Sequence, residues 1–207
     1  TVILESQDQK IRLQCKLNDG VIVQHTITSD EDSVDFQITA YNPTKKNSKA
    51  HWGQPCIRVG KFTGYGDPAN GISYDYIERS FIFLDGKLSL MPTKDWETKA
   101  RYTPGQVWAA PGVKGEDVNP RPLNPHSPSN ALIGCFSKDG KVLLAAAFDP
   151  YQELFQGVIH CLHNDFRLGG LNPGETKKVH GKIYVLPAHI PTLLSRYRQD
   201  FPNHSQH

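Results

Sequence analysis

Residues 10–27, "KIRLQCKLNDGVIVQHTI", decide the fold class of this chain. The first half places Ile11, Leu13, Cys15 and Leu17 at every second position, with polar side chains between them. Alternate residues of a strand point to the same face, so this spacing predicts a half-buried β-strand. The turn residues "NDG" follow at 18–20, and "VIVQHTI" returns as a second strand. Together they predict an antiparallel hairpin.

The same pattern continues along the chain. Short apolar or alternating runs recur between turn residues, with "DG" pairs at 85–86 and 139–140. These runs are "VDFQITAYN" (34–42), "CIRVGKF" (56–62), "SFIFLDGKLSLM" (80–91), "ALIGCF" (131–136) and "KVLLAAAF" (141–148). Short strands separated by turns are typical of all-β domains. We therefore predict an all-β fold, an antiparallel β-sandwich forming a single domain over residues 1–207.

Two regions depart from the strand pattern. Residues 102–130 are rich in proline and lack periodicity, which predicts a long ordered loop, and its 103–130 portion is a candidate surface for a protein partner. The segment "IPTLLSRYRQDF" has apolar residues at helical spacing, which predicts a C-terminal amphipathic helix at about 190–201. The tail 202–207 is expected to be frayed.

The segment from Tyr151 to Arg167 fits two secondary structures. A helix beginning near Asp149 would place His160 and His163 on one exposed face, where both could chelate a metal. In a strand beginning at Gly157, the two imidazoles would point to opposite faces. Gly157 and the β-branched residues after it favour the strand.

Composition excludes several classes of protein. The 23 basic and 21 acidic residues leave a net charge of +2 without a basic cluster, so no nucleic-acid partner is expected. No apolar run approaches the roughly 20 residues of a membrane helix, so no membrane span is expected. The four cysteines, Cys15, Cys56, Cys135 and Cys161, form no CxxC pair. They are expected to be buried free thiols, and disulfides would require an oxidising compartment.

One combination of segments resembles a known group. "AYNPTKK" (40–46), "HWGQPCIRVG" (51–60), "CLHNDFRLGGLNPGETKKVHGKIYVL" (161–186) and a terminal helix are similar to uncharacterised, mostly exported bacterial proteins. Their domains are similar to galactose-mutarotase-like and carbohydrate-associated β-sandwiches. The resemblance covers most of the chain and implies the fold, a secreted or periplasmic location and a glycan-rich context. It implies no activity.

Two loops carry candidate binding residues. His51, Trp52 and Gln54 suit a saccharide, because an indole packs on C–H faces while amide and imidazole groups bond hydroxyls. Trp108, Arg121 and His126 lie in the proline-rich loop and could form the rim of the same site. The alternative is that both tryptophans only fill the protein interior.

A second set is suited to acid–base chemistry. Its members are His160, His163, Glu153, Asp165 and Arg167. Histidine titrates near neutrality, and a neighbouring carboxylate can orient it. A divalent metal would need a further ligand such as His51, His126 or His180. The alternative is an Asp165–Arg167 ion pair beside a buried His160.

Three functions therefore remain open. The first is binding of a carbohydrate or polysaccharide without a cofactor. The second is a lyase-type, epimerase-type or metal-dependent enzyme in which His160 or His163 is an acid, base or ligand. The third is a protein-interaction module that uses the 103–130 loop.

Overall fold

The computed structural model describes residues 1–66, 75–93, 107–118 and 123–206. The chain begins with a four-stranded antiparallel meander, in which the hairpin predicted at residues 10–27 is present. Gly20 at the turn has φ = +96°, a backbone conformation that favours glycine. The four strands are β1 (Val2–Gln7), β2 (Lys10–Lys16), β3 (Ile22–Ser29) and β4 (Ser33–Tyr41).

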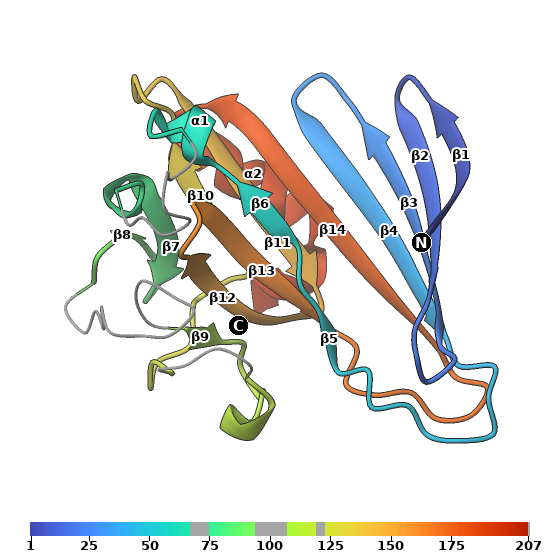
Figure 1. Ribbon diagram of the computed structural model, residues 1–207. Coiled ribbons are helices and arrows are strands. Elements are labelled where there is room, and N and C mark those ends of the chain that lie inside the picture. The colour runs from blue at the N-terminus through green and yellow to red at the C-terminus, as the bar shows by residue number, and fades with distance from the viewer. Residues whose placement is uncertain (67–74, 94–106, 119–122, 207) are drawn as a thin grey trace.

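A long central strand joins this meander to the rest of a nine-stranded sheet. Strand β14 (Thr176–Pro187) pairs antiparallel with β4 on one side and with β11 on the other (Figure 1). The sheet order is β1-β2-β3-β4-β14-β11-β10-β7-β8. The remaining strands are β7 (Ser80–Leu84), β8 (Lys87–Leu90), β10 (Ile133–Phe136) and β11 (Val142–Asp149).

A smaller sheet packs on one face of the large sheet. Its centre is the hairpin of β12 (Tyr151–Gly157) and β13 (Cys161–Arg167), and β13 lies against β10 and β11. Three short strands flank this hairpin: β5 (Trp52–Gly53), β6 (Cys56–Arg58) and β9 (Trp108–Ala109). The predicted all-β antiparallel sandwich is confirmed.

The hairpin also decides the secondary structure of residues 151–167. The strand interpretation is correct and the helix interpretation is wrong, because β12 and β13 pair with each other and with strands on both sides. The strand start predicted at Gly157 is wrong: Gly157 ends β12, a turn follows at 158–160, and β13 begins at Cys161. His160 in that turn has φ = +53°.

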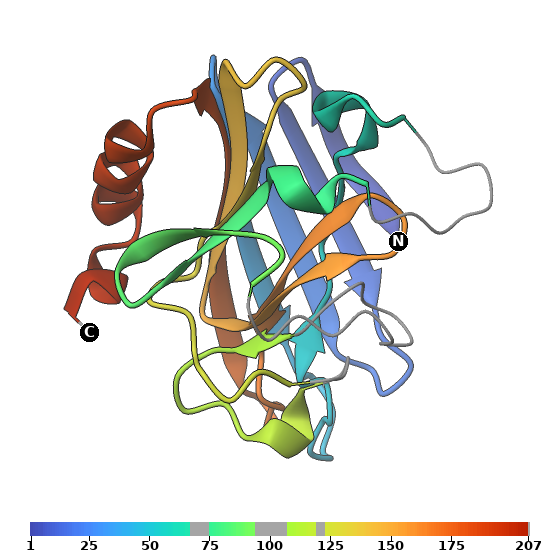
Figure 2. The ribbon, with the colours of Figure 1, turned by 90° about the vertical axis from the view of Figure 1, so that its left-hand side faces the viewer.

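The C-terminal helix covers the other face of the large sheet. Helix α2 (Ile190–Asp200) lies on the side opposite the small sheet, and it buries Leu193 and Tyr197 (Figure 2). The tail expected to be frayed instead forms the 3₁₀ helix η3 (Pro202–Gln206), in which His204 bonds the Tyr197 hydroxyl. None of the described helices has the length and apolar character needed to cross a membrane.

Three short helices lie between the described strands, and one of them interrupts a predicted strand. The strand predicted at 56–62 ends at Arg58, and α1 (Gly60–Thr63) follows. A side chain at Gly60 would contact the Gly66 carbonyl and would lie 2.9 Å from His160 Nδ1, so only glycine fits there. The others are η1 (Ile77–Arg79) and η2 (Gly115–Asp117).

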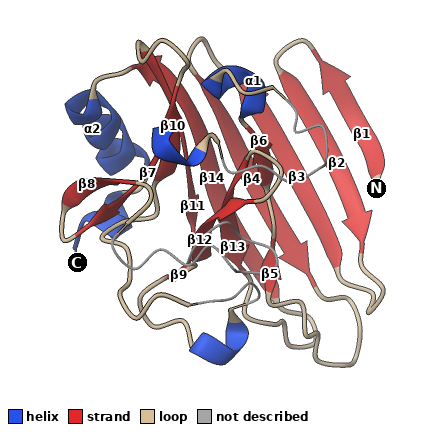
Figure 3. Ribbon diagram, turned by 60° about the vertical axis from the view of Figure 1, so that its left-hand side comes forward, coloured by secondary structure: helices blue, strands red, loops and turns tan. Residues whose placement is uncertain are grey.

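The small sheet is narrower than the large one. Its strand β13 lies over β10 and β11, while β1–β3 extend past its edge (Figure 3). The main apolar core lies under the small sheet, where Trp108, Leu154 and Leu162 pack with Phe81 and Ile133. Both faces of β12 and β13 are buried, unlike the usual sandwich strand with one solvated face.

Candidate functional site

The outer face of the β12–β13 hairpin is polar and buried. Glu153 lies opposite Asp165, Phe155 opposite His163, and Gly157 opposite Cys161. Directly opposed residues of an antiparallel pair have their side chains on the same face. Leu162, Asn164 and Phe166 alternate with these residues and face the large sheet. The inner face of the hairpin thus packs on the large sheet, whereas its outer face carries carboxyl, imidazole and thiol groups.

Two carboxyl groups meet on this outer face. Glu153 and Asp165 are fully buried, and Asp165 Oδ2 accepts a hydrogen bond from Gln54 Nε2 at 3.0 Å. Burial and the adjacent Glu153 carboxylate raise the pKa of Asp165 to about 9, although the Gln54 bond opposes the shift. Asp165 therefore carries a proton at neutral pH, because two neighbouring buried carboxyls cannot both ionise at low cost.

His163 lies beside this pair and is held by two contacts. Its ring stacks on Phe155 with centroids 4.3 Å apart, and Nε2 lies 3.1 Å from Cys161 Sγ. Its Nδ1 lies 3.8 Å from Asp165 Oδ1, beyond hydrogen-bond distance. Burial lowers the pKa of His163 to about 4, against a smaller opposing effect of the Pro55 backbone. The imidazole is therefore neutral at pH 7.

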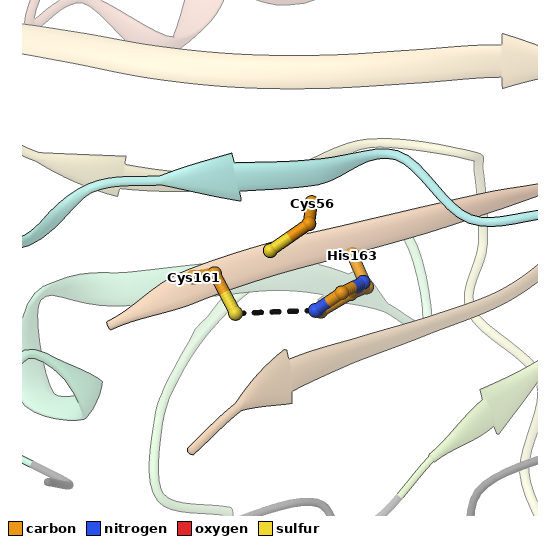
Figure 4. Close-up of side chains that lie close together, drawn as sticks. All are labelled: Cys56, Cys161 and His163. Carbon is orange, nitrogen blue, oxygen red and sulfur yellow. Dashed lines mark hydrogen bonds between the residues drawn. The ribbon is translucent and has the colours of Figure 1, made fainter. Parts of the chain in front are cut away.

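A third chemical group comes from a different part of the chain. Strand β6 pairs with β13 so that Cys56 lies opposite His163. Cys56 Sγ, Cys161 Sγ and a ring nitrogen of His163 all lie within 4.8 Å of one another (Figure 4). These three residues form what we call the Cys–Cys–His cluster. Such a cluster can hold a metal ion.

The spacing of the cysteines in the sequence gives no sign of this cluster. No CxxC pair is present, and 104 residues lie between Cys56 and Cys161. The expectation that the cysteines are buried thiols holds for Cys135 and Cys161, whereas Cys56 is exposed. Only the pairing of β6 with β13, which local sequence does not encode, could have indicated the cluster.

Arg167 belongs to a separate network at the end of the hairpin. Its Nη2 lies 2.8 Å from Asp117 Oδ2, and its Nη1 donates to Gln152 Oε1 at 3.0 Å. The Arg167 guanidinium lowers the pKa of Asp117 through this hydrogen bond. The Asp165–Arg167 ion pair considered from the sequence is therefore wrong: Arg167 pairs with Asp117.

His160 and His180 do not meet His163 at a common site. His160 Nδ1 bonds the Gly66 carbonyl at 2.7 Å, and its ring packs against Tyr76, away from His163. The Tyr76 hydroxyl lies 2.7 Å from the carbonyl oxygens of both Gly157 and Cys161 and shares its one proton between them, which fixes the turn between the strands. His180 bonds Asp35 on the large sheet at 2.7 Å.

A groove opens where the large sheet extends past the small one. Its volume is about 350 Å³, within the range of small-molecule sites. We call it the Trp52 groove. Its lining residues are Cys15, Leu17, Val23, His25, Ile27, Phe36, Ile38, Trp52, Gly53, Gln54, Pro55, Phe148, Phe166 and Leu168.

The predicted binding residues are divided by the structure. Trp52 and Gln54 line the Trp52 groove, and Gln54 also reaches Asp165. Trp108 is fully buried in the main core. His51 and His126 are exposed and do not line the groove, and Arg121 lies outside the described residues.

The proline-rich loop is only partly described. Within 103–130, residues 107–110 are buried, and Val107 packs with Val118 and Phe155. Residues 103–106 and 119–122 lie outside the described residues.

Comparisons with known proteins concern the fold. No family model matches the sequence, and no curated protein matches it. Among solved structures, a galactose mutarotase-like protein from Lactobacillus casei ATCC 334 has a TM-score of 0.50 at 12% identity, over 89% of this chain and 72% of that one.

Two further structures are similar at lower scores. A putative aldose 1-epimerase from Escherichia coli K12 has a TM-score of 0.44 at 11% identity, covering 88% of this chain and 67% of that one. A galactose mutarotase related enzyme from Lactobacillus acidophilus has a TM-score of 0.46 at 11% identity, covering 89% and 70%. The fold of this chain is therefore similar to that of galactose mutarotase-like proteins, at an identity that carries over no activity.

Proposed function

We propose that this protein binds a saccharide in the Trp52 groove. The observation that carries the proposal is that Trp52 and Gln54, two residues singled out for sugar binding, line the same groove of about 350 Å³. The likeness of the fold to galactose mutarotase-like proteins supports a carbohydrate as the ligand class. Such a ligand also fits the secreted or periplasmic location that we expect for this chain.

The groove has the two kinds of surface that a sugar ring requires. The indole of Trp52 and the side chains of Phe36 and Ile38 offer apolar surface for the C–H face of a pyranose. The imidazole of His25 and the amide of Gln54 offer donors and acceptors for hydroxyl groups. Ligand sites commonly combine a mostly apolar lining with a few placed polar groups.

Binding is favoured over catalysis because the acid–base groups are covered. Glu153 and Asp165 are fully buried, and Gln54 is the side chain that links Asp165 to the groove. A sugar in the groove would contact Gln54 and not a carboxyl group. We therefore propose recognition, with Gln54 held in place by Asp165.

The test is a binding titration. Calorimetry with a panel of monosaccharides and soluble polysaccharides should identify a ligand for the wild-type protein. Trp52→Ala should lower the affinity for that ligand by up to about tenfold, because aromatic stacking contributes about 0.5–1.5 kcal/mol. Trp52→Phe should recover most of the loss.

The matched control is His126→Ala, at an exposed residue outside the groove, which should bind like the wild type. Absence of saccharide binding by the wild type, or equal binding by Trp52→Ala, would contradict the proposal.

A further inference from the structure

We propose that Cys56 Sγ, Cys161 Sγ and His163 Nε2 form a binding site for Zn²⁺. The site rests on the β6–β13 pairing and is independent of saccharide binding in the Trp52 groove. It would lie under the outer face of the small sheet, beside the Glu153–Asp165 pair.

The spacing of the three atoms fits tetrahedral zinc. With Zn–S distances of about 2.3 Å and Zn–N distances of about 2.0–2.1 Å, neighbouring ligand atoms are roughly 3.5–3.8 Å apart. The three ligand atoms here all lie within 4.8 Å of one another, and Cys161 Sγ is 3.1 Å from His163 Nε2. Adjustments of a few tenths of an ångström to about one ångström would bring them to zinc geometry.

The orientation of His163 is a second, independent observation. Nε2 points into the cluster, while Nδ1 faces Asp165 Oδ1 at 3.8 Å (Figure 4 shows the ring). Neither Nδ1 nor Oδ1 makes a hydrogen bond of ordinary length and angle with a described residue, although both atoms are buried. The interactions of His163 with the Pro55 backbone and of Asp165 with Glu153 are weaker than that. Histidines that bind zinc usually donate their other N–H to a carboxylate or carbonyl. A small ring movement would give His163 that bond.

Gly157 leaves the space that an ion needs. A side-chain carbon at this position would contact Cys161 Sγ and would lie 2.9 Å from His163 Nε2. The strand opposite Cys161 therefore carries the one residue type that leaves this side of the cluster open.

The donor atoms select the metal class. Two thiolates and one neutral imidazole suit Zn²⁺, whereas Mg²⁺ and Ca²⁺ prefer oxygen ligands. Binding would release the two thiol protons to solvent, so that the two thiolates balance the 2+ charge of the ion. No fourth histidine, cysteine or carboxylate joins the cluster among the described residues, which leaves the fourth position for water or another small ligand.

A disulfide fits the geometry less well. Cys56 is opposite His163, so Cys161 is its diagonal neighbour across the two strands. Diagonal pairs have Cα atoms about 7–8 Å apart, whereas disulfides usually need about 4.4–6.8 Å. A metal ion spans this separation without moving the backbone.

The test uses the purified full chain. Zn²⁺ titrated in competition with a chromophoric chelator should bind with 1:1 stoichiometry. Co²⁺ should bind at the same site and give the near-ultraviolet absorption of a thiolate–cobalt bond. Cys56→Ser, at the exposed ligand, should remove that absorption. It should lower the affinity for Zn²⁺ by more than about 10–100-fold, the loss typical when a residue that only hydrogen-bonds a metal ligand is removed.

Two variants complete the design. Cys15→Ser is the matched control, because Cys15 lies on β2 away from the cluster, and it should bind Zn²⁺ like the wild type. Asp165→Asn should lower the affinity for Zn²⁺ about 10–100-fold, while the Co²⁺-loaded variant should keep the thiolate–cobalt absorption. Circular dichroism verifies that each variant is folded. Equal Zn²⁺ affinity in Cys56→Ser and wild type, no Zn²⁺ binding at all, or a Cys56–Cys161 disulfide that Zn²⁺ does not prevent would each overturn the proposal.

Discussion

The Asp165 side chain shows how a single buried residue is supported by its neighbours. It shares the outer face of the hairpin with Glu153 and accepts a hydrogen bond from Gln54. Its carboxyl group is fully buried, so its charged form lacks the solvation that water would provide. Burying Asp165 therefore destabilises the fold. Its position next to His163 and Gln54 suggests that the residue is kept for a functional role.

Asp165→Asn should make the protein more stable. Asparagine keeps an acceptor for Gln54 and offers an amide donor to Glu153, while the second ionisable group is removed. Measured by urea unfolding in a chelating buffer at pH 7, the free energy of unfolding should rise by at least about 1.4 kcal/mol, the equivalent of one pKa unit.

The pH dependence of this gain has a definite sign. The pKa of Asp165 rises from 3.8 to about 9 on folding. As pH rises between these values, the unfolded chain loses this proton while the folded protein keeps it, so wild-type stability falls relative to Asp165→Asn. The gain should vanish below about pH 4. Glu31→Gln, at an exposed carboxylate, should show no such gain. A stability difference between Asp165→Asn and wild type that stays the same from pH 4 to pH 9 would contradict the interpretation.

Gly157→Ala should destabilise the hairpin. The added methyl group would press on Cys161 Sγ and on His163 Nε2, 2.9 Å away. Overpacking of this kind costs about 1–3 kcal/mol in thermal or urea unfolding. Gly115→Ala is the control, because its added carbon meets only the flexible end of Leu123 at 3.2 Å. If Gly157→Ala lowered the free energy of unfolding no more than Gly115→Ala does, the prediction would be wrong, and the cluster would have room for the methyl group.

At the scale of elements, the C-terminal segment is fastened to the large sheet by a short relay. Asp149 at the end of β11 contacts His204 of η3 at 2.8 Å, and His204 Nδ1 bonds the Tyr197 hydroxyl of α2 at 2.6 Å. Tyr197 in turn accepts a hydrogen bond from the Ala131 backbone. Strand, helix and tail are therefore joined at one histidine.

Asp149→Asn should weaken this attachment above about pH 4. The His204 hydrogen bond lowers the pKa of Asp149 below its usual value of 3.8. Stability from this contact is therefore present at neutral pH and is lost as pH falls through the lowered pKa. The melting temperature of Asp149→Asn should lie below that of wild type at pH 7, and the difference should shrink as pH falls below 3.8. Glu116→Gln, at an exposed residue, should follow the wild type at both pH values.

At the scale of the whole molecule, the two sheets of the sandwich differ in width. The meander β1–β3 extends past the small sheet, so the inner faces of these strands are only partly covered. Val23, His25 and Ile27 alternate along β3 and line the Trp52 groove. The groove is therefore a consequence of sheet size and not of a special loop.

Ile27→Trp should fill the groove. Because Ile27 is only half-buried, the larger side chain can be accommodated in the open space, and the free energy of unfolding should change by less than about 1.5 kcal/mol. Saccharide binding should be lost in calorimetry, while Zn²⁺ binding should stay unchanged. Gln24→Trp places the same side chain on the opposite face of β3 and should retain saccharide binding. Loss in both variants would argue against the groove as the site.

Part of the candidate site was predictable from local pattern. The alternation of "CLHNDFR" places Cys161, His163 and Asp165 on one face once the segment is a strand. The Gly157 position and β-branched neighbours favoured that strand. The partners Cys56, Gln54 and Asp117 were not predictable as contacts, because each comes from a distant segment and reaches the hairpin only through strand pairing or loop packing.

The sequence by itself determined the all-β class, the main hairpins and the C-terminal helix, because period-2 and period-3.6 patterns and turn residues act over a few neighbouring positions. Tertiary structure decided which histidine meets which partner. It placed His160 in the turn and His163 on β13, paired Arg167 with Asp117, and brought Cys56 to Cys161. The physical reason is that register between strands distant in sequence depends on the packing of the whole sandwich, which no local pattern of residues encodes.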